Sequence, residues 1–208
     1  MEDSIARGPD DEGGDAMVQP ALAHDTSQQH TIHDLFDMPE DGHRYEVEDG
    51  VLIVSPAPTD FHQIASDELY TILRQAAPDH LRVVSAAALR LRADHTGFVP
   101  DLKIVRRGPR KSFSEAEDTQ AVVEIVSPSS RHRDRVRKPE LYARAGIACY
   151  WRVELNPFRG QGRLEVPVVI VHELVDGAYS TTDRFGAGER RTVALPYPVT
   201  LDPATLLG

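Results

Sequence analysis

Two carboxylates that interrupt apolar segments are the first candidates for chemistry in this chain. Asp101 follows Pro100 in FVPDLKIV, and Glu124 lies within AVVEIV. Because an isolated buried charge is costly, such carboxylates are normally paired, hydrogen-bonded or bound to a metal. Two of them on successive strands would repel each other, and an oxygen-preferring divalent cation, Mg²⁺ or Mn²⁺, would relieve that repulsion. A turn-capping role for Asp101 and an arginine partner for Glu124 are equally consistent with the residues alone.

Lys138 is the third candidate, because of its spacing from two neighbours. Asp134, Lys138 and Tyr142 follow one another at intervals of four residues, which places them on one face of a helix. That helix comes shortly after the Glu124 segment, so its first turns can lean over the carboxylates. A lysine there could orient an attacking water and neutralise charge on a phosphoryl group. The alternative is an ordinary exposed Asp–Lys pair.

A run of basic residues precedes Lys138. Arg131, Arg133 and Arg135 could contact phosphates, although such a run taken alone is more often a solvated helix face. The net charge of −10 argues against a protein that wraps nucleic acid over its whole surface. Residues 1–30 account for −6 of that charge, which leaves only −4 for the rest of the chain. Local nucleic-acid binding therefore remains compatible with the composition.

The hydrophobic pattern predicts the elements that position these candidates. Apolar residues recur at helical spacing in 60–77, and Asp49-Gly50 favours a tight hairpin between two strands in 44–54. Further helices are predicted at 31–39 and 134–145, and further strands at 81–91, 98–106, 121–126, 148–155 and 166–175. This order predicts a mixed sheet flanked by helices.

Composition limits the class of protein. The apolar content of 40% and the charged content of 27% are ordinary for a globular domain. No apolar run reaches the roughly 18 residues of a membrane-spanning helix, and the acidic N-terminus does not resemble a secretory signal. The single cysteine, Cys149, excludes an internal disulfide framework. We therefore expect a cytoplasmic protein without membrane association, with a disordered acidic tail over 1–30 and one domain over 31–208.

Four ordered blocks of the chain resemble the Uma-type restriction endonuclease family, a branch of the PD-(D/E)XK nuclease-like superfamily. The blocks are RYEVEDGVLIVSPAPTDFHQ (44–63), VPDLKIVRRG (99–108), VVEIVSPSS (122–130) and DRVRKPELYARAGIACYWRVE (134–154). With the ending TLDPATLL, the resemblance covers residues 31–207. It implies an α+β (α/β) fold with a restriction endonuclease-like core, in which a mixed β-sheet is flanked by helices, and an added N-terminal β-hairpin.

The resemblance assigns expected roles to individual residues. Pro100-Asp101 matches the PD pair and Glu124 matches the second acid, and both acids would bind the metal. The usual lysine two residues later is absent, since position 126 is valine, and its match in this family is Lys138 on the following helix. Pro139 implies that the helix either begins or kinks at that lysine, which leaves its direction open.

Two further matches lie nearer the N-terminus. Glu46 matches an acid on the first hairpin that would aim at the catalytic site, although an exposed hairpin carboxylate is the alternative. His62 matches a histidine at the start of the first long helix, where it would contact substrate or simply cap or pack the helix.

The implied activity is metal-dependent hydrolysis of DNA phosphodiester bonds. Asp101, Glu124 and the backbone carbonyl of Ile125 would hold one or two Mg²⁺ ions, and a homodimer would suit cutting of both strands. The alternative from another class is an inactive nuclease fold that binds nucleic acid or serves regulation. A third interpretation, an RNA-processing or mobile-element-associated nuclease, shares the chemistry and differs in substrate. Motifs for phosphate-cradling, dinucleotide-binding and nucleophile-elbow enzymes are absent from the sequence.

Overall fold

A computed structural model describes residues 29–208 of the protein. Most of the predicted acidic tail, residues 1–28, lies outside the described residues. The last two residues of that predicted tail are placed against the first hairpin. The backbone N–H of His30 donates to the carbonyl of Gly50 at 2.8 Å, and Gln29 packs over Gly50.

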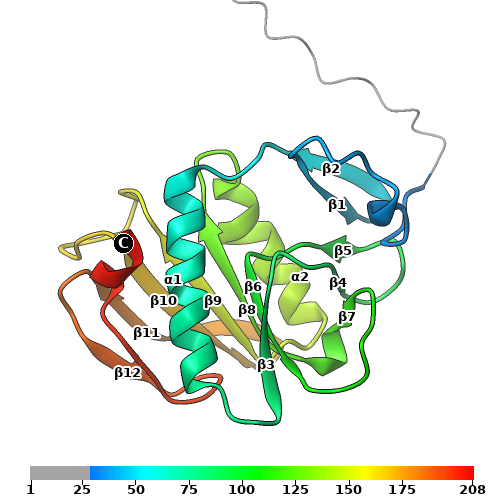
Figure 1. The fold of residues 1–208 in the computed structure, drawn as a ribbon. Helices are drawn as coiled ribbons and strands as arrows, with labels where there is room; N and C mark the ends of the chain where they lie inside the picture. The colour runs from blue at the N-terminus through cyan, green and yellow to red at the C-terminus, as the bar shows by residue number, and fades with distance from the viewer. Residues whose placement is uncertain (1–28) are drawn as a thin grey trace, which may run out of the picture.

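The centre of the fold is a six-stranded sheet in the order β11-β10-β9-β8-β6-β3 (Figure 1). Its members are β3 (Leu81–Ser85), β6 (Leu102–Arg106), β8 (Thr119–Val126), β9 (Cys149–Glu154), β10 (Val168–Val175) and β11 (Ala178–Gly186). The pair β8–β9 is parallel and every other neighbouring pair is antiparallel. The predicted mixed sheet is therefore confirmed.

Helix α1 (Asp60–Ala76) covers one face of this sheet. Thr59 caps it, accepting a hydrogen bond from the backbone N–H of His62 at 3.3 Å. The apolar stripe of α1, including Leu69 and Leu73, is buried in one core cluster with Leu102 and Ile104 of β6. Since side chains alternate along a strand, the intervening residues of β6 belong to the opposite face of the sheet.

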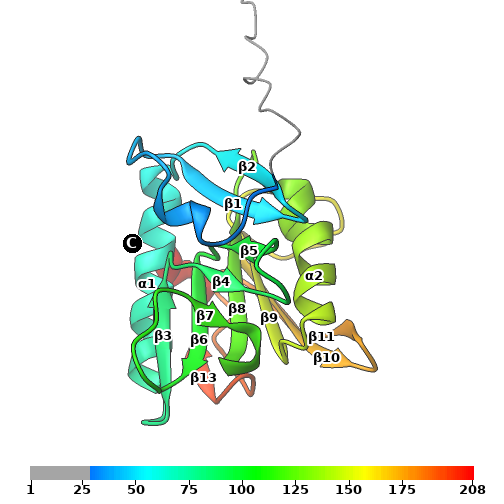
Figure 2. The ribbon, with the colours of Figure 1, turned by 90° about the vertical axis from the view of Figure 1, so that its right-hand side faces the viewer.

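A second, five-stranded sheet lies over that opposite face in the order β2-β1-β5-β4-β7 (Figure 2). Its members are β1 (Arg44–Glu48), β2 (Val51–Ser55), β4 (Leu89–Arg90), β5 (Gly97–Phe98) and β7 (Ser114–Glu115). The predicted hairpin is formed by β1 and β2, with positive φ angles of 50° at Asp49 and 82° at Gly50. Both angles are those of a primed two-residue turn.

Two predicted strands are each divided between the two sheets. The predicted strand 81–91 separates into β3 and β4, and 98–106 separates into β5 and β6. Ala86, with a φ of 43°, marks the first break, and Pro100, which has no backbone N–H for a sheet ladder, marks the second. The backbone N–H of Ala86 donates to the carbonyl of Asp101 at 3.0 Å, so the two breaks lie side by side.

The ends of the domain differ from the prediction. The predicted helix at 31–39 is reduced to a short 3₁₀ turn, Asp34–Phe36. The sheet extends beyond the predicted last strand through β11, and the strands β12 (Arg191–Val193) and β13 (Val199–Leu201) follow it. A final 3₁₀ turn, Pro203–Leu207, packs near α1.

The predicted helix at 134–145 has two parts. A π-helical turn, η3 (Arg133–Arg137), leads directly into α2 (Lys138–Arg144), and the N–H of Lys138 donates to the carbonyl of Arg133. In a regular α-helix, the Pro139 ring would meet the carbonyl four residues earlier. The wider turn before Pro139 allows the helix to run through Lys138 without a break. No helix within residues 29–208 is long and apolar enough to cross a membrane.

Candidate active site

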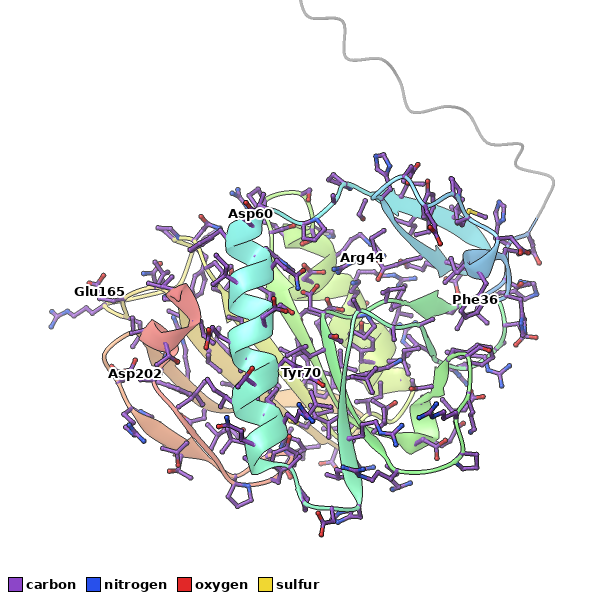
Figure 3. The ribbon with its side chains drawn as sticks, in the orientation of Figure 1. Phe36, Arg44, Asp60, Tyr70, Glu165 and Asp202 are labelled. Atoms are coloured by element: carbon purple, nitrogen blue, oxygen red, sulfur yellow. The ribbon has the colours of Figure 1, made fainter. Side chains whose placement is uncertain are left out.

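Four buried carboxylates surround one cavity of about 350 Å³. The cavity lies between the β1–β2 hairpin, the N-terminal end of α1 and the end of β8; in Figure 3, Arg44 lies between the hairpin and the helix start at Asp60. Each of the four carboxylate residues is at most 2% exposed. They come from β1, the break before β6, β8 and the π-helical turn: Glu46, Asp101, Glu124 and Asp134.

Both oxygens of Asp101 are engaged. Oδ1 accepts from Nη1 of Arg44 at 2.7 Å, and Oδ2 accepts from the backbone N–H of Ile125 at 2.7 Å. Nε2 of His62 lies 3.3 Å from the same Oδ2 and 3.1 Å from the carbonyl oxygen of Ile125. Burial raises the pKa of Asp101, but His62, Arg44 and the Ile125 N–H together hold it down at about 2. Asp101 is therefore ionised at neutral pH.

Only one carboxyl oxygen of Glu124 accepts hydrogen bonds from residues 29–208. Its Oε1 accepts hydrogen bonds from Nζ of Lys138 at 3.0 Å and from the Tyr142 hydroxyl at 2.5 Å. No hydrogen bond or ion pair among residues 29–208 uses the other oxygen, Oε2. Burial, together with the charges of Asp134, Asp101 and Glu46, raises the pKa of Glu124 to about 8 despite Lys138. A negative charge on Glu124 would be poorly compensated, so in the metal-free protein this residue largely holds its proton at neutral pH.

Lys138 points into the cavity and meets three carboxylates. Its Nζ lies 3.0 Å from Oε1 of Glu46, 3.0 Å from Oε1 of Glu124 and 3.7 Å from Oδ1 of Asp134. Burial lowers the pKa of Lys138, but Glu124, Glu46 and Asp134 raise it well above its usual range. The lysine therefore carries a positive charge at neutral pH. The sequence did not determine where the Lys138 side chain points, because Pro139 follows it; in the structure it points towards Glu46 and Glu124.

Glu46 and Asp134 complete the cluster in different ways. Glu46 accepts from the backbone N–H of Val99 at 2.9 Å and lies 3.0 Å from Nη2 of Arg133. Burial raises its pKa, while Lys138 and Arg133 lower it below its usual value on balance. Asp134 has a buried Oδ1 without a hydrogen-bond partner in the described chain, and burial raises its pKa.

The donor set around the cavity suits a hard cation. Carboxylate oxygens of Asp101 and Glu124 and the nearby carbonyl of Ile125 are the ligand types that Mg²⁺ and Mn²⁺ prefer. Four carboxyl groups face three permanent cations here, and two of the carboxyl oxygens, Oε2 of Glu124 and Oδ1 of Asp134, have no hydrogen-bond donor within residues 29–208. Within residues 29–208, no group of three or more His, Cys, Asp or Glu residues has the geometry of a metal site. A bound cation would therefore need the protein and water to share its ligands.

The remaining predicted site residues lie at different places. His62 and Arg133 line the cavity. Arg131 is exposed at the start of the helix and is not part of the cavity lining. Arg135 makes two hydrogen bonds, of 2.8 and 2.7 Å, to the buried carboxylate of Glu154. Arg135 is therefore engaged in an ion pair outside the cavity.

The structure adds three residues that sequence reasoning did not place in the site. Arg44 binds Asp101, Asp134 approaches Lys138, and Tyr142 binds Glu124. The spacing of Asp134, Lys138 and Tyr142 already indicated a shared helix face. Arg44 lies two residues before Glu46 on one strand, so the alternation of side chains could have placed it beside that acid.

Comparisons with known proteins agree with this architecture. A solved structure from Anabaena variabilis ATCC 29413, described as a “putative nuclease belonging to DUF820”, is 18% identical with a TM-score of 0.64. The match covers 85% of this chain and 97% of that one, and at this identity it shows the fold alone. No curated protein matches the chain. The family Uma2, described as “Putative restriction endonuclease”, matches residues 32–204. The chain therefore belongs to the Uma2 family and has the restriction endonuclease-like fold that its sequence predicted.

Proposed function

We propose that this protein is a metal-dependent endonuclease that hydrolyses phosphodiester bonds of DNA in the cavity beside Asp101 and Glu124. The observation that supports the proposal best is the convergence of four buried carboxylates and one charged lysine from four separate segments of the chain. A domain does not bury that many charges for stability, because burying ions costs more than their pairing returns. Such clusters are typical of functional sites.

Lys138 is the residue proposed to stabilise charge on the phosphate. Its ammonium group is held by carboxylates on two sides and is protonated at neutral pH. It therefore serves as a hydrogen-bond donor and positive charge towards a phosphoryl oxygen or an attacking water, rather than as a base. Glu46, through its contacts with Lys138 and Arg133, holds both cations over the cavity.

Asp101 and Glu124 would hold Mg²⁺ or Mn²⁺, with the carbonyl of Ile125 beside them. When bound, the cation would acidify a water molecule and polarise the scissile phosphate. Arg44 and His62 fix the orientation of the Asp101 carboxylate, and Tyr142 fixes that of Glu124. Burial lowers the pKa of His62, but the Asp101 carboxylate raises it on balance, which strengthens this contact.

Cleavage of supercoiled plasmid DNA tests the proposal. The purified protein with Mg²⁺ should nick the plasmid, and Asp101→Asn should abolish nicking while leaving the far-ultraviolet circular dichroism spectrum unchanged. Arg190→Ala, an exposed change before β12, is the matched control and should cut as the wild type does. Equal nicking by the wild type and Asp101→Asn would indicate a contaminating nuclease and defeat the assignment.

One observation favours an alternative, a nuclease fold that binds nucleic acid without cutting it. Both Asp101 oxygens already have protein partners, and Lys138 is surrounded by carboxylates. A metal titration separates the two functions: Mg²⁺ or Mn²⁺ should raise the melting temperature of the wild type but not that of Glu124→Gln. DNA binding without any metal-dependent shift would favour the non-catalytic module.

A further inference from the structure

A second cavity, of about 420 Å³, lies at the other end of β6 from Asp101. It is formed by β3, β6 and the loop 107–113 that leads to β7, and it shares no lining residue with the first cavity. Figure 2 shows this loop on the side of the molecule that carries β3 and β7. Six of its lining residues are basic and one, Asp118, is acidic: Arg82, Lys103, Arg106, Arg107, Arg110 and Lys111.

Lys103 is the buried member of this basic set. It is only 1% exposed, and its ammonium group donates to the carbonyls of Ala87 at 2.8 Å and Ala88 at 2.5 Å. Within residues 29–208, no carboxylate lies within ion-pair distance of it. Carbonyl groups satisfy hydrogen bonds but do not neutralise charge, and an uncompensated buried cation is costly.

The positive charges of the exposed basic residues in this cavity also largely lack carboxylate partners. In the described part of the chain, only Lys111 has a carboxylate partner, Asp118 at 3.0 Å. Arg106 and Arg107 donate to the backbone carbonyls of Glu117 and Leu81, at 2.9 and 3.0 Å. A concave surface lined by one sign of charge concentrates counter-ions. This one stands out in a chain whose net charge is −10.

We propose that this cavity binds the phosphates of a DNA strand at a position away from the bond that is cut. The choice of DNA rests on the proposed nuclease function. Four arginines without a carboxylate partner exceed what a single phosphate requires, which favours several successive phosphates of one strand over a small phosphorylated molecule. From Asp101 to Arg106 the chain spans roughly 17 Å at about 3.4 Å per residue. That length corresponds to about five nucleotides of a DNA strand.

The test measures DNA binding without cutting. Fluorescence anisotropy of a labelled duplex is recorded in EDTA over a range of salt concentrations. Arg82→Ala/Arg110→Ala should weaken binding about tenfold at moderate salt and reduce the slope of log K against log salt by about two. Lys103→Met should weaken binding by a smaller factor, and Arg190→Ala should leave affinity and slope unchanged. Both arginines of the double variant are exposed, so the fold should tolerate their loss.

Each outcome decides the proposal. Unchanged affinity and slope in the double variant would overturn it, even if the wild type cuts DNA with Mg²⁺. Loss of binding in the double variant would support it, even if Asp101 proves irrelevant to cutting. A small phosphate is the other source of the same chemistry. If inorganic phosphate raises the melting temperature of the wild type but not that of Lys103→Met, while DNA binding is equal in all variants, the strand assignment is wrong.

Discussion

Two lysines of this protein are almost equally buried and yet have opposite surroundings. Lys138, 3% exposed, meets the carboxylates of Glu46, Glu124 and Asp134, whereas Lys103, 1% exposed, meets only two backbone carbonyls. Burial lowers the pKa of both, but the carboxylates more than offset this effect at Lys138. Burial alone therefore does not determine the charge of a buried lysine, because the nearest ionised groups decide it.

For these two lysines, closeness to Asp101 in the sequence does not correspond to closeness to the buried acids in space. Lys103 is two residues from Asp101, but it lies within β6 and lines the second cavity, whereas Asp101 lies at the break before β6 and contacts His62 of α1. Lys138 is far along the chain, but the π-helical turn aims it at Glu124. The lysine nearest the PD pair in sequence is thus not the lysine nearest the acids in space.

The largest expected effect is that of removing the paired lysine. Lys138→Met leaves Glu46 and Glu124 buried without their common cation, so we expect DNA cleavage to be lost. Stability should also fall by roughly 3 kcal/mol, the order expected for breaking a buried pair. Urea unfolding at pH 7 and plasmid nicking measure the two effects. Lys138→Arg, which keeps the charge, should recover most of the stability, and a stable Lys138→Met would show that the ion pairs contribute little.

The two sites should also respond to pH in opposite directions in the metal-free protein. The pKa of Glu124 is about 8 in the folded protein and near 4.5 in the unfolded chain, so the folded state holds the extra proton between these values. The wild type should therefore lose stability relative to Glu124→Gln as the pH rises from 4.5 to 8, by at most about 1.4 kcal/mol per pH unit.

For Lys103 the dependence of stability on pH has the opposite sign. Its pKa is about 7 in the folded protein and near 10.5 in the unfolded chain, so the unfolded state holds the extra proton in that window. The wild type should gain stability relative to Lys103→Met as the pH rises from 7 towards 10. Urea midpoints of the three proteins across pH measure both slopes, and parallel curves for the wild type and Lys103→Met would contradict the difference between the sites.

The smallest expected effect is that of Lys103→Met at pH 7. Methionine is unbranched and of similar length, and it removes a buried cation that lacks a carboxylate partner. The free energy of unfolding should rise or stay within about 1 kcal/mol of the wild-type value. A loss as large as that of Lys138→Met would mean that the two carbonyl hydrogen bonds stabilise the fold as strongly as the three carboxylates do.

Long periodic segments of the fold could be predicted from the sequence, and short ones could not. The stripe of α1, the apolar run of β8 and the Asp49-Gly50 turn each have a local pattern that the structure confirms. Strands β4, β5 and β7 have two residues each, too few to show any alternation. Strand β11 was missed because it is a largely exposed edge strand, so its outer residues are polar and give no apolar period.

Some residues of the candidate site could likewise be predicted from the sequence, and others could not. The structure brings Asp101, Glu124, Lys138 and Glu46 to one cavity, as the family pattern led us to expect, while their catalytic roles remain predictions. Strand alternation could have placed Arg44 on the same face as Glu46, but its partner Asp101 lies 57 positions away, and no local pattern encodes that contact. The engagement of Arg135 by Glu154 depends equally on tertiary packing.

The number of residues in the π-helical turn before α2 determines where the side chains of this turn point relative to the site. Loss of one residue between Arg133 and Arg137 would restore ordinary α-helical winding, in which each residue advances by about 100°. Leu141 packs in the core and would keep α2 in place, so Asp134 would rotate away from Lys138 instead. Substitution of the exposed Val136 should thus be tolerated more readily than a deletion in this turn, and in related chains we expect the number of residues here to stay fixed.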